Sequence, residues 1–364
     1  MAKKKSRIRN VGKKAILFLN LLVSALLLYP LFFAPSSLIW INGFLGILTP
    51  YLLAIEVLLF LFWIIAKPLL ALPSALSLLV GWKAIAVLIA LHPGTQFPNK
   101  KKENSLRVVS WNVRGFNGVK ANSGLKLRTQ DIAYSIQKWK PDIICMQEYN
   151  TNERVGDIAN HAQYFAEQYP YSFFSKDYQT PESAYYSGCI IYSKYKILQA
   201  TRTAFFNQES IIAATLLKGD DTIRVFTTHL ASYRFKQNDF EAIDNTTKSK
   251  WGVLKKMKQA FVERAVQAEQ VKAQLNASPY PSILTGDFND VPNSYTYHTI
   301  AQGWQDAFIQ RGVGIGATFM GLSPILRIDY ILTDAHWQVK AWEQSDENLS
   351  DHQMIMADLQ LKKQ

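Results

Sequence analysis

Three long apolar stretches near the N-terminus constrain the architecture of this chain more than any other feature. Residues 15–33, AILFLNLLVSALLLYPLFF, carry no charge and are long enough to cross a bilayer, which takes about 20 apolar residues. A second stretch covers 38–66, and a third, covering 69–91, is interrupted by a proline and a lysine. We therefore predict a membrane anchor of about three transmembrane helices over residues 1–91. Two spans with an interfacial third segment are the alternative.

Positive charge flanks the first stretch on one side only. Seven Lys and Arg residues lie within residues 1–14, whereas the loop at 34–37 has none. Because cytoplasmic flanks are enriched in Lys and Arg, we predict a cytoplasmic N-terminus at a cell (inner) membrane. Three spans then place the chain after residue 92 on the extracytoplasmic side, and two spans would place it in the cytoplasm. A cleaved signal peptide is less favoured, because more apolar stretches follow instead of a small-residue cleavage site.

The net charge of +12 belongs mostly to this N-terminal part. Residues 1–99 hold nine cations and one carboxylate, a net of +8, which leaves +4 for residues 100–364. The body of the chain therefore gives no charge argument for nucleic-acid binding. Cys145 and Cys189 each lie in an apolar run, which favours burial as small hydrophobes; the sequence leaves open whether they pair.

After the apolar part, the pattern changes to that of a folded domain. Residues 92–105 have the Pro, Gly, Asn and Lys content of a linker, and the domain is expected over 106–364. Helical spacing covers 127–138 and 253–276. The runs expected as strands are LRVVSWNV, DIICMQE, CIIYS, KILQATRTAFF, IIAATLL, TIRVFTTHL, SILTGD, RIDYILTD, WQVKAWE and HQMIMADLQL. Many strands with few helices predict two sheets with helices outside them.

The run SILTGD leads into two polar residues of useful chemistry. Asp287 and Asn289 are two positions apart, so in an extended segment both side chains face one side. A carboxylate can orient or deprotonate water, and a carboxamide can donate hydrogen bonds to a phosphate. Asp and Asn after Gly286 are equally typical of a plain turn, so this pair alone does not establish a site.

Polar residues of the same kinds lie at the ends of other predicted strands. Each alone has a structural explanation, such as a turn or a hydrogen-bonded core histidine. Together, at the ends of successive strands, they indicate a site that handles phosphate and metal. These residues are Asn112, Glu148, His229, Asp329 and the pair Asp351-His352, which would open the last strand.

The motifs WNV, QE, THL, GDFND, RIDYIL and SDH, in this order, resemble the endonuclease/exonuclease/phosphatase superfamily with its DNase I-like fold. The resemblance covers residues 105–361, and the apolar stretches ahead of it are similar to those of membrane-anchored bacterial members. It implies an α/β fold, a four-layered sandwich of two packed mixed β-sheets flanked by helices. N-terminal transmembrane helices would precede this sandwich.

The resemblance also implies a divalent-metal site. Glu148 would be the main ligand, with Asn112 close by and Asp351 as a second carboxylate. Hard oxygen ligands of this kind suit Mg²⁺ or Mn²⁺, which retain several waters and bind substrate phosphate.

Catalytic roles follow from the same resemblance. His352 would be the general base or a phosphate contact, oriented by Asp329 through its other ring nitrogen. His229 and Asn289 would donate hydrogen bonds to the non-bridging phosphate oxygens. Asp287 would position or activate the attacking water, and no covalent intermediate is required.

These residues predict a metal-dependent hydrolase of phosphoric esters, more specifically a nuclease-like phosphodiesterase at a bacterial membrane. Its partners would be a phosphodiester, in nucleic acid or in a phospholipid head group, and the bilayer. A phospholipid-, sphingomyelin- or inositol-phosphate-directed phosphoesterase is the first alternative. A non-catalytic membrane receptor on the same fold is the second, and it is disfavoured because none of the site residues has been replaced.

Overall fold

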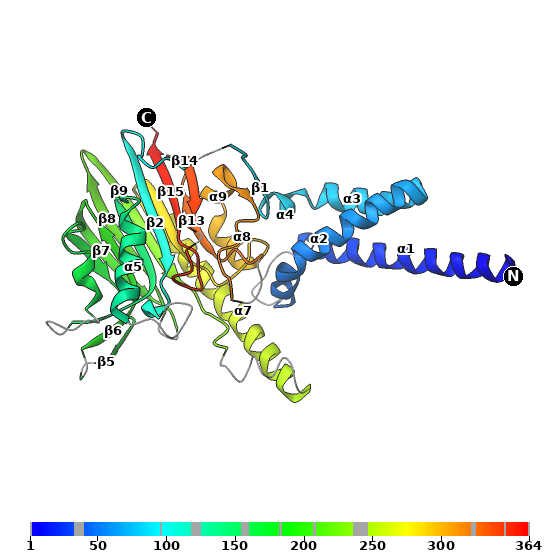
Figure 1. Cartoon of the computed structure of the whole chain (residues 1–364), viewed down its shortest axis with the longest axis horizontal. Helices are drawn as coiled ribbons and strands as arrows, with labels where there is room; N and C mark the ends of the chain where they lie inside the picture. The colour runs from blue at the N-terminus through cyan, green and yellow to red at the C-terminus, as the bar shows by residue number, and fades with distance from the viewer. Residues whose placement is uncertain are drawn as a thin grey trace. The chain divides into compact units, whose positions relative to one another are not determined.

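The chain divides into two compact units, which are described separately (Figure 1). One unit is formed by Met1–Leu88 with Asn293–Tyr295, and the other by Ile89–Pro292 with Thr296–Gln364. The computed structural model describes residues 2–32, 40–94, 97–117, 125–153, 160–180, 182, 184–206, 209–235, 247–321, 325–345 and 347–362.

The first unit is helical. It contains α1 (Ala2–Phe32), α2 (Ile41–Ala66), a 3-10 turn η1 (Pro68–Ala71), α3 (Leu72–Val80) and α4 (Trp82–Ala86). Two segments of the described chain, Val11–Tyr29 and Ile41–Ala66, are long and apolar enough to cross a membrane. The third apolar stretch forms only short helices after the extended Lys67, and α3 with nine residues spans about 14 Å. A third span therefore stays a prediction, and the short helices fit the two-span alternative better.

A buried carboxyl group connects the helices of this unit. Glu56 of α2 has no exposed surface and accepts hydrogen bonds from Ser24 of α1 at 2.5 Å and from Ser77 of α3 at 2.6 Å. Asn20 also donates to Ser74 at 2.5 Å. Because a buried polar group is costly without partners, these contacts favour packing of the third apolar stretch against the two long helices.

The second unit contains two larger sheets (Figure 1). The seven-stranded sheet has the order β14-β15-β2-β3-β6-β4, with β5 also paired to β6. Its strands are β2 (Ser105–Asn112), β3 (Ile143–Asn152), β4 (Tyr171–Phe174), β5 (Tyr178–Thr180), β6 (Tyr185–Ser193), β14 (Trp337–Gln344) and β15 (Ile355–Leu361). The pair β2/β3 is parallel and the other pairs are antiparallel, so the sheet is mixed.

The six-stranded sheet has the order β11-β13-β10-β9-β8-β7. Its strands are β7 (Lys196–Ala204), β8 (Ser210–Lys218), β9 (Asp221–His229), β10 (Ser282–Asp287), β11 (Gln305–Asp306) and β13 (Asp329–Thr333). Only β9/β10 is parallel, so this sheet is also mixed. β1 (Ala90–Leu91) and β12 (Val313–Gly314) form a further, short antiparallel pair.

Helices flank both sheets, which confirms the predicted fold class. They are α5 (Leu125–Gln137), α7 (Thr247–Asn276), α8 (Tyr295–Ala301) and α9 (Ala307–Arg311), with 3-10 turns η2 (Arg114–Phe116) and η3 (His161–Tyr164). The helix α7 connects the parallel strands β9 and β10, as a crossover between parallel strands requires.

Apolar side chains from alternate strand positions fill the space between the two sheets. Val108 and Ile143 of one sheet belong to the same buried cluster as Val225 and Ile283 of the other. The other face of the seven-stranded sheet packs against Ile132 and its neighbours on α5 in a second cluster. This alternation separates the inner face of each sheet from the outer face.

Most predicted elements form where the sequence pattern placed them. The last strand is an exception, because it begins at Ile355 and leaves Asp351-His352 in the preceding loop. The segment expected as a linker also makes defined contacts: Phe97 is buried, and Arg107 donates to the carbonyl of Pro98 at 2.7 Å. Both cysteines are buried and free.

Candidate active site

Strand alternation brings four of the predicted residues to one edge of the inter-sheet core. Asn112 follows Val108 at an even spacing, and Asp287 follows Ile283 in the same way, so both face inward with the core residues. His229 and Asp329 lie directly beside Asp287 in the ladders of β9 and β13. All four therefore lie at the same edge of the two sheets.

Glu148 reaches this edge through a β-bulge. By simple alternation it would face the side covered by α5, since the inward residues of β3 include Ile143 and Cys145. The register with β6 shifts between Met146 and Tyr149, and Glu148 has φ of +50°. A bulge of this kind redirects one side chain. It turns the Glu148 carboxylate toward the amide of Asn112, which donates to it at 3.0 Å.

The close approach of β10 to β9 requires Gly286. Its φ is +151°, and a Cβ atom there would lie 2.2 Å from the carbonyl oxygen of Thr228. Only glycine fits such a position without moving one strand. Gly286 therefore sets the position from which Asp287 enters the site.

Asp287 is the centre of the site. Its buried carboxylate accepts hydrogen bonds from the Asn112 amide at 3.0 Å and from the Asn289 backbone N–H at 2.8 Å. The Nε2 atoms of His229 and His352 each lie 3.7 Å from its Oδ2. Burial raises the pKa of Asp287, while the nearby His352 opposes that rise. Two imidazoles therefore face one desolvated carboxylate.

His352 and Asp329 form a buried pair. The Nδ1 atom of His352 lies 3.0 Å from Asp329 Oδ2, so the ring can donate this proton and is held in one orientation. Burial alone would lower the pKa of His352, but the Asp329 and Asp287 carboxylates outweigh it and raise that pKa to about 10. The two carboxylates therefore favour the protonated form of the His352 ring, which donates hydrogen bonds and cannot accept a further proton.

Asn289 does not continue the strand as predicted. The strand β10 ends at Asp287, and Asn289 has φ of +51°, so the two side chains are not neighbours on one extended segment. The Asn289 backbone N–H donates a hydrogen bond to the Asp287 carboxylate, which forms an Asx turn. Its amide nitrogen lies 2.9 Å from the Leu230 carbonyl and 3.0 Å from His229 Nε2. Asn289 thus contacts His229 directly.

Asp351 lies at the margin of this group. Its carboxylate pairs with the Arg114 guanidinium at 3.3 Å, and neither side chain is fully buried. The neighbouring Ser350 hydroxyl donates to the backbone carbonyl of Asn112 at 2.8 Å. The loop before β15 is therefore attached to the end of β2, but the structure gives Asp351 no direct contact with Glu148.

Two sets of side chains have the chemistry of a metal site. Ligand atoms of Asp287, Asp329 and His352 lie within 4.8 Å of one another. A protonated His352, hydrogen-bonded to Asp329, repels a cation and offers it no lone pair on Nδ1. Glu148 is the better first ligand, because 42% of its side chain is exposed and it provides hard oxygen atoms next to Asn112. The residues present therefore fit Mg²⁺ or Mn²⁺ at Glu148.

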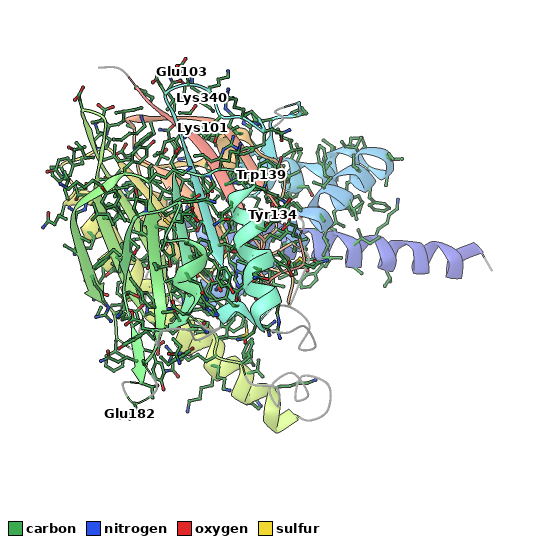
Figure 2. All side chains as sticks on the ribbon, turned by 60° about the vertical axis from the view of Figure 1, so that its left-hand side comes forward. Lys101, Glu103, Tyr134, Trp139, Glu182 and Lys340 are labelled. Carbon is green, nitrogen blue, oxygen red and sulfur yellow. The ribbon has the colours of Figure 1, made fainter. Side chains whose placement is uncertain are left out.

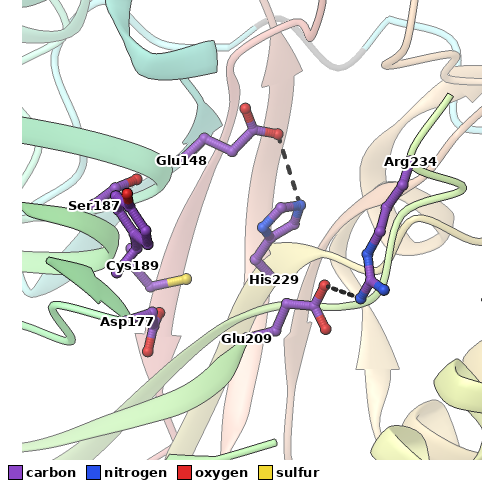
Figure 3. Close-up of a pocket in the computed structure, with 9 residues that line it drawn as sticks. Glu148, Asp177, Ser187, Cys189, Glu209, His229 and Arg234 are labelled. Atoms are coloured by element: carbon purple, nitrogen blue, oxygen red, sulfur yellow. Dashed lines mark hydrogen bonds and ion pairs between the residues drawn. The ribbon is translucent and has the colours of Figure 1, made fainter. Parts of the chain in front are cut away.

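A cavity of about 280 Å³ opens beside Glu148 and His229 (Figure 3). Arg234 reaches it from the chain after β9 and pairs with Glu209 at 3.1 Å. Neither residue was identified from the sequence, because nothing in their spacing distinguishes them from other surface charges. Arg234 and Glu209 therefore give the lining of this cavity one positive and one negative side chain.

Sequence models of known protein families match two parts of this chain. The sequence model described as "Endonuclease/Exonuclease/phosphatase family" matches residues 109–352, and that of a domain of unknown function (DUF8431) matches residues 13–88. No curated protein matches the chain.

Several solved structures have a similar fold at low sequence identity. An endonuclease/exonuclease/phosphatase from Beutenbergia cavernae has a TM-score of 0.53 and 21% identity, with 71% of this chain and 72% of that chain covered. The human Nocturnin catalytic domain with bound sulfate gives 0.53 and 16%, with 72% and 97% covered. D. rerio TDP2 in complex with a single-strand DNA product gives 0.50 and 17%, with 71% and 99% covered.

Proposed function

Because this chain belongs to the endonuclease/exonuclease/phosphatase family, we propose that it is a metal-dependent phosphodiesterase tethered to a membrane. The observation that carries the proposal is the placement of Asp287 between two imidazoles, with Glu148 exposed beside them. This arrangement combines an acceptor for a water proton, donors for phosphate oxygens and a carboxylate for a divalent ion.

Each side chain has a role in the proposed hydrolysis. Asp287 orients the attacking water and accepts its proton, because burial has raised its pKa above that of an exposed Asp. The His352 imidazolium donates a hydrogen bond to a non-bridging oxygen, and Asp329 holds its ring in place. Asn289 orients His229, which provides a second contact to the phosphate.

The metal proposal concerns Glu148 and its neighbours. Glu148 would hold Mg²⁺ or Mn²⁺, and Asn112 orients its carboxylate. Asp351 would become a second carboxylate ligand if its ion pair with Arg114 opened. When bound, the ion supplies positive charge that stabilises negative charge developing on the phosphate.

Two substrate classes have support. The complex of D. rerio TDP2 with a single-strand DNA product favours a nucleic-acid phosphodiester. The two long apolar helices favour a phospholipid head group, because they would keep the site near lipid. We propose a bacterial membrane for these helices. Three spans would leave the catalytic domain extracytoplasmic, and two would leave it cytoplasmic.

The test is a substrate panel with the purified full-length chain in detergent. Plasmid DNA, RNA, phospholipid vesicles, inositol phosphates and an activated phosphodiester are each incubated with Mg²⁺ or Mn²⁺. We expect hydrolysis of the activated diester and of one natural class. Absence of hydrolysis of all of them, from protein shown to be folded, would favour the non-catalytic receptor.

Replacing Asp329 by Asn is expected to shift the pH dependence of the reaction. The substitution removes the main charge that raises the pKa of His352, so the alkaline limb of kcat/KM moves from near pH 10 to lower pH. The raised pKa also stabilises the fold fully below the ordinary value of about 6.5, and this contribution is lost as pH rises through about 10. Compared with the unmodified protein, the free energy of unfolding of Asp329→Asn should therefore be lowered most below about pH 6.5. This difference should disappear as the pH rises through about 10.

The matched control for this prediction is Asp334→Asn, which changes a carboxylate at the opposite end of the β10/β13 pair. Asp334 accepts from the Ser282 backbone N–H at 2.7 Å and has no contact with His352. Its pH profile should match that of the unmodified protein. An Asp329→Asn profile with the same alkaline limb as the control would show that His352 does not act as an imidazolium.

A further inference from the structure

The helix α7 is much longer than the strands that it connects. Its 30 residues span about 45 Å, whereas the six residues of β10 span about 20 Å. Its C-terminal end leads to the start of β10, so the excess length lies at the other end, beyond the last residues of β9. Figures 1 and 2 show the N-terminal part of α7 extending past the strands.

Contacts along α7 show where it passes the edge of the sheets that carries His229 and Asp287, which is called the catalytic edge below. Arg264 donates to the Ala231 carbonyl at 2.8 Å and pairs with Asp290, and Gln267 accepts from the Ala231 backbone N–H at 2.8 Å. Ala231 lies two residues after His229. The part of α7 that precedes Arg264, as far as Lys250, extends for about 21 Å beyond the contact with Ala231. This segment, residues 250–262, is called the projecting segment below.

The projecting segment and the next turn present an unusual combination on one exposed face. Trp251 is 71% exposed, and Val262 and Val266 are also exposed. With Lys255 and Lys258 they recur every three or four residues, which places them on one stripe of the helix. Leu254 is exposed at the edge of this stripe. The stripe is therefore both apolar and basic.

The charge of this region has one sign. The sequence KSKWGVLKKMK over residues 248–258 contains five lysines, and no Asp or Glu occurs between Asp244 and Glu263. The rest of the catalytic part is close to neutral, so this concentration of lysines is a local feature. It is complementary to a surface of fixed negative charge.

We propose that the projecting segment docks on an anionic membrane surface and holds the catalytic edge toward lipid. An interfacial helix combines Lys with Trp and aliphatic residues, because the aromatic ring and alkyl chains enter the head-group region while the ammonium groups meet lipid phosphates. A nucleic-acid backbone would use the lysines but leave Leu254, Val262 and Val266 without apolar partners. The inference rests on the proposed membrane tether, which keeps a bilayer within reach.

The test places a fluorescent probe on the projecting segment of the full-length chain. Leu254→Cys is labelled with an environment-sensitive dye; Cys145 and Cys189 are buried and stay unlabelled in the folded protein. The protein is reconstituted into phosphatidylcholine vesicles with or without phosphatidylglycerol, each carrying a lipid-bound nitroxide quencher. The matched control is Gln270→Cys, an exposed position of α7 behind the catalytic edge.

We expect quenching at Leu254→Cys to exceed that at Gln270→Cys severalfold in the anionic vesicles. It should weaken without phosphatidylglycerol and in about 1 M salt, where the Debye length is about 3 Å. Adding Lys250→Glu and Lys255→Glu to the labelled protein should remove most of the difference. Because quenching needs no turnover, the Asp287→Asn variant should give the same result, and this separates docking from the proposed catalysis.

Equal quenching at the two positions, or quenching that does not depend on lipid charge, would overturn the proposal. An emission change at Leu254→Cys on adding single-stranded DNA, with no response to lipid, would assign the segment to nucleic acid instead. A change that depends on protein concentration in detergent alone would assign it to contact between two copies of the chain.

Discussion

Replacing Asp287 by Asn is expected to lower kcat by about 10²- to 10⁴-fold, the usual effect of removing a general base. The amide keeps the size of the side chain but cannot accept a proton from water. The loss should appear with any substrate that the protein hydrolyses, because the substitution affects the attacking water and not the leaving group. The measurement is kcat on the activated phosphodiester with purified full-length protein.

Part of the effect of Asp287→Asn could come from stability, and this part can be measured separately. In either orientation the new amide would place its NH₂ group against a donor, either the Asn112 amide at 3.0 Å or the Asn289 backbone N–H at 2.8 Å. An unsatisfied buried donor costs about 1–3 kcal/mol, so we expect a lower Tm for a protein that is still folded at assay temperature. Asp334→Asn is again the control, with an expected rate close to that of the unmodified protein. A rate for Asp287→Asn equal to this control would exclude Asp287 from the chemical step.

Periodicity explains why much of the fold and part of the site could be predicted from sequence. Alternating apolar residues in runs such as TIRVFTTHL define strands, and the same alternation fixes which face the terminal His229 occupies. The direction of Asn112, Asp287 and Asp329 follows from the same rule. Asn112, His229 and Asp287 lie at or next to the carboxyl ends of strands in the parallel pairs β2/β3 and β9/β10. Asp329 joins them from the start of β13, which is antiparallel to β10.

Three features of the site are not encoded by the periodicity of the sequence. Glu148 faces inward only because of the bulge with positive φ, and Asn289 reaches His229 through a turn and not along a strand. The third feature is the raised pKa of His352. It comes mainly from Asp329 and Asp287, two carboxylates that are distant from His352 in sequence.

The lengths of the helices were harder to predict from sequence than their existence. The run over residues 69–91 is apolar enough for a span, yet it is broken into short helices, and proline occurs in the first turns of η1 and α3. The extension of α7 before residue 253 was not expected, because Gly252 and the lysines obscure the helical pattern. The membrane proposal for the projecting segment therefore rests on the exposure and charge of its residues.

Removal of divalent metal should abolish the activity, and Glu148 should control how much metal is needed. With a chelator we expect no hydrolysis, and with added Mg²⁺ or Mn²⁺ we expect full recovery. Glu148→Gln keeps the shape of the side chain and its neighbour Asn112 but removes the negative charge from the proposed ligand. Even loss of a partner of a metal ligand typically costs about 10- to 100-fold in metal affinity. We therefore expect the Mg²⁺ concentration for half-maximal rate to rise by at least that factor.

The control for Glu148→Gln is Glu209→Gln, which removes a carboxylate from the same cavity. Glu209 pairs with Arg234 at 3.1 Å and accepts from Gln267 at 2.8 Å, so both of its oxygens already have partners. Its substitution should leave the metal requirement unchanged and affect only how substrate binds beside Arg234. If Glu148→Gln and Glu209→Gln have the same half-maximal Mg²⁺ concentration, the metal is not held at Glu148. Full activity in chelator would show that the two imidazoles and Asp287 act without a metal.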